Sequence, residues 1–318
     1  MMNTPIYCGI DVAKKQMVIG FTHKAKTKTF TQNTTDIQHA VAYLLAAAPE
    51  LIVMESTGGL EIPLAKALYH AGLRVIIANP RQTNQFALSQ SLAKTDVKDA
   101  KMLACYAQMM AIRDNVEVSL YIPPSEEQQK LEATVKQRLH FVELRTAEKN
   151  RLQQIDESQR VNTEAFIGYL DNLIAKLDKD INEQHQHFSD KIELIKDIKG
   201  VGQNLTAVLM SMLPELGTLT GKQIASLVGV APHPKESGSM KFHRRCWGGR
   251  KAVRNALYMS ALVASRYEPA ITLFYQRLLA RGKPFKVAIN ACMRKLLTII
   301  NALVKQGEKW DSLRYLAA

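Results

Sequence analysis

The first hundred residues alternate short apolar runs with longer stretches in which apolar residues recur at helical spacing. Strands are expected over 6–10, 17–21, 28–32, 51–54 and 74–78. Helices are expected over 36–48, 60–71, 82–91 and 97–111. The first three strands follow one another directly, which predicts an antiparallel start to the sheet. The order βββαβαβα predicts an α/β domain with a mixed sheet over residues 1–122.

The pattern changes after Pro123-Pro124. From residue 125 to 196 the chain is rich in Glu, Gln, Lys, Leu and Ile and almost without Gly or Pro. Apolar residues recur three and four apart at Leu170, Leu173, Ile174, Leu177 and Ile181. This spacing predicts long helices packed as a coiled coil, so segment 123–196 is interpreted as a helical linker and dimerisation arm.

The last segment, 197–318, is expected to be mainly α-helical. It begins with the turn Gly200-Val201-Gly202, which leads into a helix at 203–212. Such a turn suits an anion, although a plain connection between helices needs the same glycines. A loop rich in Gly and Pro at 229–249 precedes helices near 250–266 and 286–304.

Charge changes this picture. The chain has 42 Lys and Arg residues against 29 Asp and Glu, a net charge of +13. This excess favours a polyanionic partner, DNA, because neutralised phosphates release counterions; a basic surface kept for solubility is the alternative. Seven cations concentrated in one stretch are interpreted as DNA-backbone contacts. They are Lys235, Lys241, Arg244, Arg245, Arg250, Lys251 and Arg254.

Other site types and locations are less favoured. The four cysteines lie far apart, and the spacing of His233, His243 and Cys246 matches no common zinc finger. No apolar run is expected to span a bilayer and no export leader is recognised, so a cytoplasmic protein without a membrane partner is predicted.

Four acids stand where a metal site is expected. Asp11 ends the first strand in GIDVAKK and Glu55 ends the strand LIVME. Asp96 and Asp99 lie three apart at the start of a helix, and therefore on one face of it. Gathered carboxylates suit Mg²⁺ or Mn²⁺, and two such ions can serve phosphodiester chemistry. Taken singly, each acid is more often a surface or capping group, and Glu61 is a rival for Glu55.

Three segments carry a specific resemblance. GIDVAKK, VMESTGG and AKTDVKDAKMLA resemble the acidic motifs of the DEDD transposases of the insertion sequence 110 family, which the Piv-type site-specific DNA invertases share. The resemblance implies a RuvC-like domain with an RNase H fold. It also implies that the four acids of the family correspond to Asp11, Glu55, Asp96 and Asp99.

The loop containing Glu236-Ser237-Gly238-Ser239 resembles the transposase domain of the same family. That resemblance implies that Ser237 is a nucleophile that forms a covalent phosphoserine–DNA intermediate, with Ser239 as the competing candidate. From the residues alone, Ser237 is more simply a loop serine in a turn, because a serine hydroxyl needs a base, a metal or strongly positive surroundings to react.

The sequence therefore predicts a DNA recombinase, a transposase, that acts as a homo-oligomer: a dimer, and a tetramer on DNA. Some members of the family are guided by a structured noncoding RNA, and the basic surface is compatible with such a partner. The alternatives are a site-specific invertase of the same family, a RuvC-like structure-selective endonuclease without a covalent intermediate, and a basic nucleic-acid-binding protein with an inactive acidic pocket.

Overall fold

The computed structural model describes residues 5–314 except 25, 90–95, 115, 233–235, 238–239, 242–245 and 313. The chain divides into two compact units, Met1–Pro123 and Pro124–Ala318. The helices expected as a separate linker belong to the second unit, so an independent arm over 123–196 stays a prediction. Each unit is described by itself.

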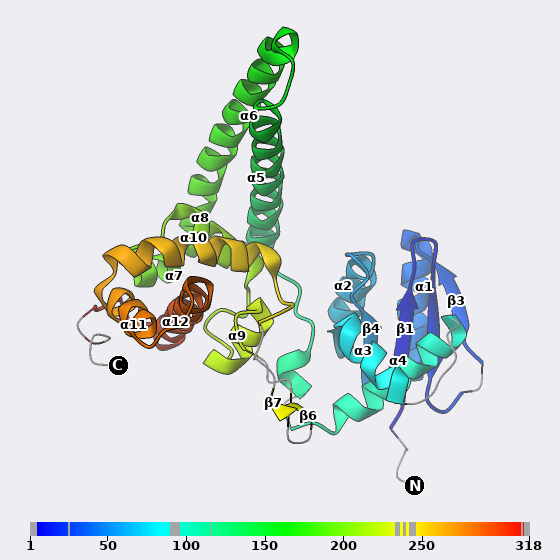
Figure 1. Cartoon of the computed structure of the whole chain (residues 1–318). Helices are drawn as coiled ribbons and strands as arrows, with labels where there is room; N and C mark the ends of the chain where they lie inside the picture. The colour runs from blue at the N-terminus through cyan, green and yellow to red at the C-terminus, as the bar shows by residue number, and fades with distance from the viewer. Residues whose placement is uncertain are drawn as a thin grey trace. The chain divides into compact units, whose positions relative to one another are not determined.

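The N-terminal unit is built on a five-stranded sheet with the order β3-β2-β1-β4-β5 (Figure 1). Its strands are β1 Tyr7–Val12, β2 Gln16–Phe21, β3 Lys28–Thr31, β4 Leu51–Glu55 and β5 Val75–Ala78. The first three pair antiparallel, whereas β1, β4 and β5 pair parallel. The predicted mixed sheet is confirmed.

Helices cover both faces of this sheet. The cluster formed by Ile10, Ile52 and Met54 packs against α1 (Thr34–Ala47) and α2 (Ile62–His70). On the other face, Tyr7, Leu51 and Val53 pack against α4 (Asp96–Ala111). The 3-10 helix η1 spans Val116–Ser119 and α3 spans Pro80–Ser89. Buried residues alternate between two filled faces, as expected for strands of an α/β layer.

A glycine allows α4 to approach β1 closely. A Cβ on Gly9 would lie 2.1 Å from the carbonyl oxygen of Ala100 and 2.3 Å from the nitrogen of Ala104. Any larger residue at Gly9 would push the helix away from the strand. The beginning of α4 is thereby held against β1, the strand that contains Asp11.

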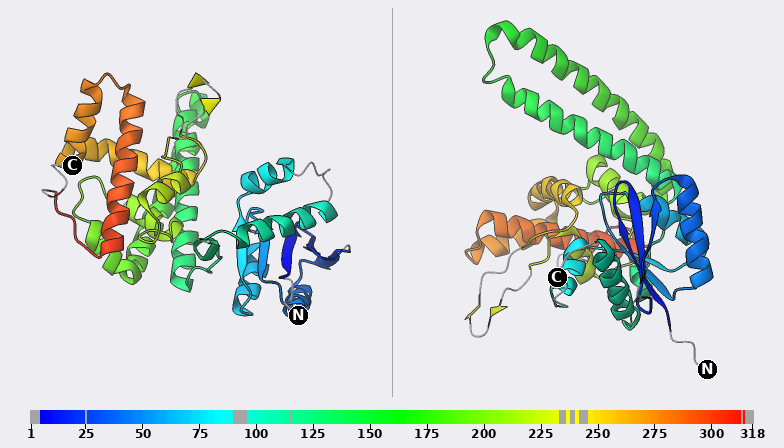
Figure 2. Two further views of the ribbon diagram at one scale, coloured as in Figure 1. Left: turned by 90° about the horizontal axis from the view of Figure 1, so that it is seen from below. Right: turned by 90° about the vertical axis from the view of Figure 1, so that its right-hand side faces the viewer.

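In its described residues the C-terminal unit is helical apart from one small hairpin of strands (Figure 2). Its helices are α5 Glu126–Arg151, α6 Glu157–Gln184, η2 His185–Phe188, α7 Ser189–Ile195, α8 Gln203–Met212, α9 Gly221–Val228, α10 Lys251–Tyr267, α11 Pro269–Ala280 and α12 Phe285–Gln306. The strands β6 Glu236–Ser237 and β7 Met240–Lys241 pair antiparallel. One continuous apolar core joins α5, α8, α9, α10 and α12.

Helices α5 and α6 form an antiparallel hairpin, which we call the α5–α6 hairpin. Arg138 pairs with Asp178 and Arg145 pairs with Asp171, so positions rise along α5 as they fall along α6. The predicted apolar stripe is buried at Leu170, Ile174 and Ile181. The long helices are thus confirmed, whereas their supercoiling as a coiled coil stays a prediction.

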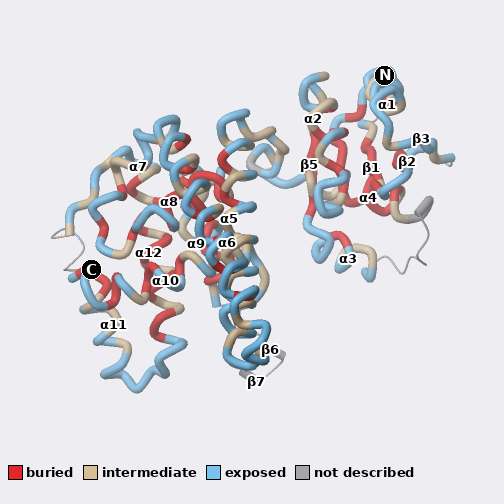
Figure 3. Tube along the Cα trace, turned by 90° about the horizontal axis from the view of Figure 1, so that it is seen from above, coloured by how far each residue is buried: buried red, intermediate tan, exposed pale blue. Residues whose placement is uncertain are grey.

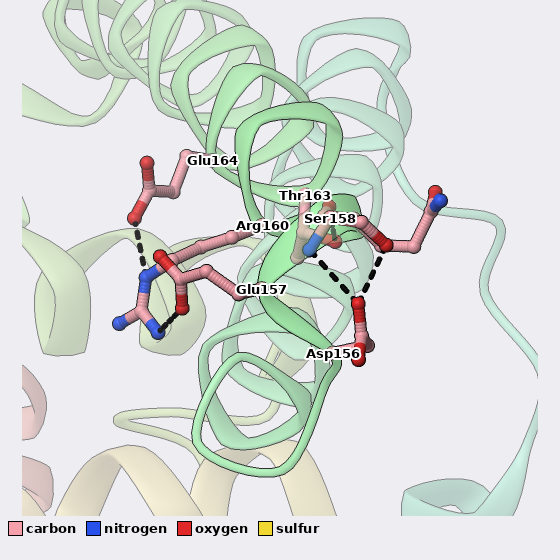
Figure 4. Close-up of polar contacts among 7 residues, drawn as sticks. Asp156, Glu157, Ser158, Arg160, Thr163 and Glu164 are labelled. Atoms are coloured by element: carbon pink, nitrogen blue, oxygen red, sulfur yellow. Dashed lines mark hydrogen bonds and ion pairs between the residues drawn. The ribbon is translucent and has the colours of Figure 1, made fainter.

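The beginning of α6 is fixed by a side-chain cap at the tip of this hairpin (Figure 4). Asp156 accepts hydrogen bonds from the backbone nitrogen of Ser158 at 2.9 Å and from its hydroxyl at 2.6 Å. Arg160 pairs with both Glu157 and Glu164 one turn on either side. The cap satisfies a backbone donor that the first turn of a helix leaves without a partner.

Helix α12 corrects one expectation from the sequence. By length and composition alone it is apolar enough to cross a membrane, contrary to the prediction of no such run. It is also the central helix of the core, and 56% of its most apolar window is buried inside the protein. Ile289, Leu296 and Ile300 are buried in that core. Its apolar character is therefore explained by packing within the unit.

The glycine turn before α8 serves packing. Gly200 has a φ of +98°, and a Cβ there would lie 2.6 Å from the carbonyl oxygen of Ser260 on α10. The backbone nitrogen of Lys199 donates to the buried carboxylate of Glu268 at 3.0 Å. The close approach to α10 explains the glycine, so the helix-connection interpretation accounts for it without an anion.

Candidate active site

The parallel pairing of β1 and β4 places Asp11 beside Glu55. The register pairs Gly9 with Val53 and Ile10 with Met54, and Asp11 and Glu55 directly follow the last of these pairs on the two strands. Tyr7, Leu51 and Val53 face α4, and side chains alternate along a strand. Asp11 and Glu55 therefore project from neighbouring strand ends on the face that α4 covers. Both are partly exposed.

Glu55 is oriented by a threonine that sequence reasoning missed. The hydroxyl of Thr83, on α3, lies 2.5 Å from Oε1 of Glu55 and 3.0 Å from the carbonyl oxygen of Pro80. Thr83 is completely buried. Because the hydroxyl has one proton and donates to one acceptor at a time, its bond to Glu55 fixes Oε1 and leaves Oε2 for another partner. The polar stretch RQTNQ around Thr83 gave no signal for this role.

Asp99 is brought to the same face by α4. It precedes Ala100, whose carbonyl oxygen lies against Gly9 two residues before Asp11. Asp96 is the first residue of α4, as the predicted helix start requires, but its side chain lies outside the described residues. Asp11 and Glu55 thus lie on the face of the sheet that α4 covers, and Asp99 lies in the first turn of that helix.

The chemistry of this donor set fits a hard divalent cation, since carboxylate oxygens are the ligands that Mg²⁺ and Mn²⁺ prefer. Within the part of the chain that the structure describes, no group of three His, Cys, Asp or Glu residues is close enough to hold a metal. The fit therefore rests on the donor type and on the strand register, with Asp96 as the fourth candidate ligand.

Glu61, the rival of Glu55, has a structural role in the adjoining turn. It is 2% exposed, and its Oε2 accepts hydrogen bonds from the backbone nitrogens of Thr57 and Gly59, each at 3.0 Å. It lies at the N-cap of α2, not inside the helix as expected. Gly58 and Gly59 both have positive φ, which this tight turn requires. Glu61 thus holds the turn that follows Glu55.

The serine motif lies on the small hairpin of the C-terminal unit. Ser237 is the last residue of β6 and pairs with Met240 of β7. The side chains of Ser237 and Lys241 are not described, and Ser239, Lys235, Arg244 and Arg245 lie outside the described residues. Their predicted roles as nucleophile and as DNA contacts therefore stay predictions.

Two cations of the predicted DNA contacts bind within the protein. Arg250 donates to both carboxylate oxygens of Glu215, at 2.6 and 2.5 Å, and to the carbonyl oxygen of Met212 at 2.9 Å. Arg254 donates to the carbonyl oxygens of Val228 and Gly248. These guanidiniums hold the loop before α10 in place, whereas Lys251 is exposed at the beginning of the helix.

The neighbouring thiol also has protein partners. The Sγ of Cys246 lies 3.5 Å from the carbonyl oxygen of Val230 and 2.9 Å from Nδ2 of Asn290. His233 and His243 lie outside the described residues.

Comparison with known proteins identifies the chain. A pilin gene-inverting protein from Moraxella lacunata is 30% identical over 321 residues, covering 96% of this chain and 97% of its own length. This chain belongs to the IS110 transposase family. Residues 8–155 match the DEDD transposase profile of the IS110 type, and residues 192–276 match the transposase IS116/IS110/IS902 family. The IS110-family chain is therefore a DNA recombinase, as the sequence predicted.

Two further similarities complete the comparison. The pilin gene-inverting protein of Moraxella bovis is 29% identical over 96% of this IS110-family chain and 97% of its own. Among solved structures, T. thermophilus RuvC in complex with Holliday junction substrate matches 33% of this chain and 96% of its own. That match has 14% identity and a TM-score of 0.27.

Proposed function

We propose that this recombinase cuts and rejoins DNA through a Mg²⁺-dependent acidic site and a serine nucleophile. Asp11, Glu55, Asp96 and Asp99 are the proposed metal ligands, and Ser237 is the proposed nucleophile. The observation that carries the acidic site is the parallel register of β1 and β4, which sets Asp11 beside Glu55 on the face covered by α4. Membership of the IS110 family supports the serine.

Each step of the proposed reaction breaks one phosphorus–oxygen bond and forms another, so the phosphate stays a diester throughout. The oxygen of Ser237 attacks the phosphorus as its proton leaves to a base, and the displaced DNA oxygen departs as a hydroxyl after taking up a proton. The reverse displacement by a DNA hydroxyl then restores the serine and seals the strand. A bound divalent cation would stabilise the charge on the attacking and leaving oxygens.

The residues around the acids have their own part in this proposal. Thr83 holds one oxygen of Glu55, and Glu61 holds the turn behind it, so the carboxylate is oriented before a ligand arrives. Such supporting hydrogen bonds commonly raise metal affinity by keeping the ligand in a binding orientation. The fixed register of two buried strands keeps Asp11 in the same place.

A site-specific invertase is the second candidate. The observation that favours it is the 30% identity with a pilin gene-inverting protein over nearly the whole of both chains. The chemistry would be the same, and the arrangement of the DNA sites would decide between inversion and transposition. A cytoplasmic location, a guide RNA, and a dimer that becomes a tetramer on DNA remain predictions.

The main experiment tests covalent attachment. Duplex DNA that flanks the gene is incubated with the protein and Mg²⁺ and then separated on a denaturing gel. A protein–DNA adduct is expected with the wild type and with Ser239→Ala, and none with Ser237→Ala. Cleavage by Ser237→Ala without any adduct would point to a hydrolytic endonuclease. An adduct that is lost only in Ser239→Ala would show that Ser239 is the nucleophile instead.

A second experiment tests the metal role of Glu55 through its neighbour. Thr83→Val keeps the shape of the side chain but removes the hydroxyl, so the Mg²⁺ concentration for half-maximal activity should rise roughly 10- to 100-fold. Thr83→Ser should restore it, because the serine keeps the donor. If Thr83→Val folds normally and its Mg²⁺ dependence is unchanged, the proposal that Thr83 orients Glu55 as a metal ligand is wrong.

A further inference from the structure

The three helices α10, α11 and α12 present a surface almost without acids. Residues 251–306 contain ten Lys or Arg residues and one acid, Glu268, a net charge of +9. Glu268 is 1% exposed and accepts a hydrogen bond from the backbone of Lys199. The exposed surface of this segment therefore carries positive charge with no carboxylate to balance it.

The positive charge is concentrated at the turn between α11 and α12. Arg281, Lys283 and Lys286 lie within six residues of one another, and every residue from 279 to 287 is exposed (Figure 3). Within the described part of the chain, none of these three cations forms an ion pair. The nearest acid in sequence after the turn is Glu308.

The turn has a defined shape. The backbone nitrogen of Gly282 donates to Leu279 at 2.8 Å and that of Lys283 donates to Leu278 at 3.1 Å. Gly282 has a φ of +72°, the left-handed conformation that ends many helices. Pro284 then precedes α12 and supplies no capping side chain. The three cations are therefore displayed from a hydrogen-bonded turn, beside the positive end of a long helix.

Lys295 on α12 and Arg277 on α11 add two further cations to this pair of helices. The Nζ of Lys295 on α12 lies 4.8 Å from the ring centre of Phe274 on α11. Burial lowers the pKa of Lys295, and the nearby Arg277 lowers it further. Two positive groups packed together without a carboxylate repel one another, and an external anion would relieve that repulsion.

Apolar side chains accompany the cations. Leu279 is 41% exposed, Phe285 47% and Val287 53%. Phe285 stands between Lys283 and Lys286 in the sequence. A surface that mixes unpaired cations with an exposed ring suits the sugar–phosphate backbone, which offers charge and an apolar sugar edge.

We propose that the turn between α11 and α12 binds the phosphate backbone of duplex DNA, as a contact surface additional to residues 235–254. Arg281, Lys283 and Lys286 supply the phosphate contacts and Phe285 packs against the sugars. The contact positions DNA without reading its sequence, because contacts to phosphates and sugars carry no sequence information. It depends on neither the metal ligands nor Ser237.

The test compares two variants of the full chain with equal changes of charge. In the turn variant, Arg281→Gln, Lys283→Gln and Lys286→Gln are combined. In the control, Lys130→Gln, Lys176→Gln and Lys179→Gln are combined, since these lysines are exposed on the α5–α6 hairpin and form no ion pair among the described residues. Binding to a fluorescent duplex of arbitrary sequence is measured in EDTA over a range of salt concentrations.

The turn variant should bind duplex DNA roughly 10- to 100-fold more weakly at moderate salt, and the slope of log affinity against log salt should shrink by about 3. The control should change affinity by no more than about threefold, and both variants should keep the wild-type melting temperature. If both variants lose the same affinity for duplex DNA, the loss reflects only the change in net charge, and the proposal is overturned. A loss confined to a structured RNA probe, with duplex binding intact, would also overturn it.

Because this assay contains EDTA and needs no cleavage, its result is separable from the test of the reaction. Failure of the covalent adduct would leave the binding measurement unchanged. A turn variant that binds normally would refute the surface while leaving Asp11 and Ser237 untouched.

Discussion

The α5–α6 hairpin and the helices α10–α12 are both rich in Lys and Arg, yet they use these residues in opposite ways. Helices α5 and α6 with their connection, residues 126–184, carry twelve acids and nine cations. Many of these cations are paired, as in Arg138–Asp178, Arg145–Asp171 and Arg160–Glu164. Helices α10–α12 carry ten cations, and their single acid is buried.

The difference shows why net charge by itself says little about where a partner binds. Of the net +13 of the chain, residues 251–306 contribute +9, whereas residues 126–184 contribute −3. Charges that face each other along a hairpin are already compensated, so they add little to an external field. Charges without partners remain available to a polyanion.

The same distinction applies within the basic stretch before α10. Arg250 and Arg254 look like DNA contacts in the sequence, but both guanidiniums bind groups of the protein. Lys251, between them, is exposed. A cation is therefore assigned to structure or to binding by its partners, and each assignment has a measurable consequence.

The largest effect is expected at Arg254. Arg254→Ala removes donors to the carbonyl oxygens of Val228 and Gly248, which are partly buried, and should lower the free energy of unfolding by about 2–3 kcal/mol. The melting temperature should fall by roughly 5–10 °C. Lys251→Ala, three residues earlier and exposed, should change stability by less than about 0.5 kcal/mol. Equal effects of the two substitutions would remove the distinction between them.

Arg250 should give a smaller effect, because its partner is about one-third exposed. A double-mutant cycle with Arg250→Ala and Glu215→Ala should give a coupling of about 1–2 kcal/mol for this bidentate pair. The coupling is read from urea unfolding of the four proteins. If Arg250→Ala binds DNA more weakly while its stability is unchanged, Arg250 contacts DNA as the sequence predicted.

Much of the N-terminal unit could be predicted from the sequence because its signals are local. Apolar runs marked the strands other than β3, which was expected from Thr and Phe alternating among polar residues, and Asp11 and Glu55 directly follow such runs. Their position on neighbouring strands depends on the parallel pairing of β1 with β4, which the order of the elements along the chain does not fix. Thr83 could not be predicted, since its hydrogen bond to Glu55 joins residues 28 apart and its own helix has polar neighbours.

Most long helices of the C-terminal unit could be predicted from the sequence, but α9, α11 and the roles of the cations were not. Arg250 meets Glu215, 35 residues earlier, and Arg254 reaches Val228, 26 residues earlier. No periodicity reports contacts of that kind. The turn between α11 and α12 has three cations within six residues, and only the structure shows that all three are exposed and form no ion pair among the described residues.

The hairpin itself supplies a smaller test. Arg138 is 15% exposed and meets Asp178, which is 34% exposed, with Nε to Oδ1 at 2.5 Å. The cycle of Arg138→Ala and Asp178→Ala should give a coupling of about 0.5–1 kcal/mol, and high salt should reduce it. A coupling as large as that of Arg250 with Glu215 would mean that the hairpin depends on its ion pairs as much as the loop before α10 does.

The smallest effect is expected when the pH is lowered, on the amide-exchange protection of α6 in the hairpin. The hydroxyl and backbone nitrogen of Ser158 hold the pKa of Asp156 below its ordinary value, and a hydrogen bond from Arg145 does the same for the pKa of Asp171. A carboxyl whose pKa is lower in the folded state stabilises the fold above its unfolded pKa, near 4, and loses this contribution as the pH falls through the folded value. Amide exchange, corrected for its intrinsic pH dependence, should therefore show α6 losing protection below about pH 4, while α10–α12 change less. Asp156→Asn keeps a capping oxygen but cannot titrate, so its first turn should lose less protection in acid; an identical acid response in the wild type and Asp156→Asn would show that the cap contributes nothing to the pH dependence.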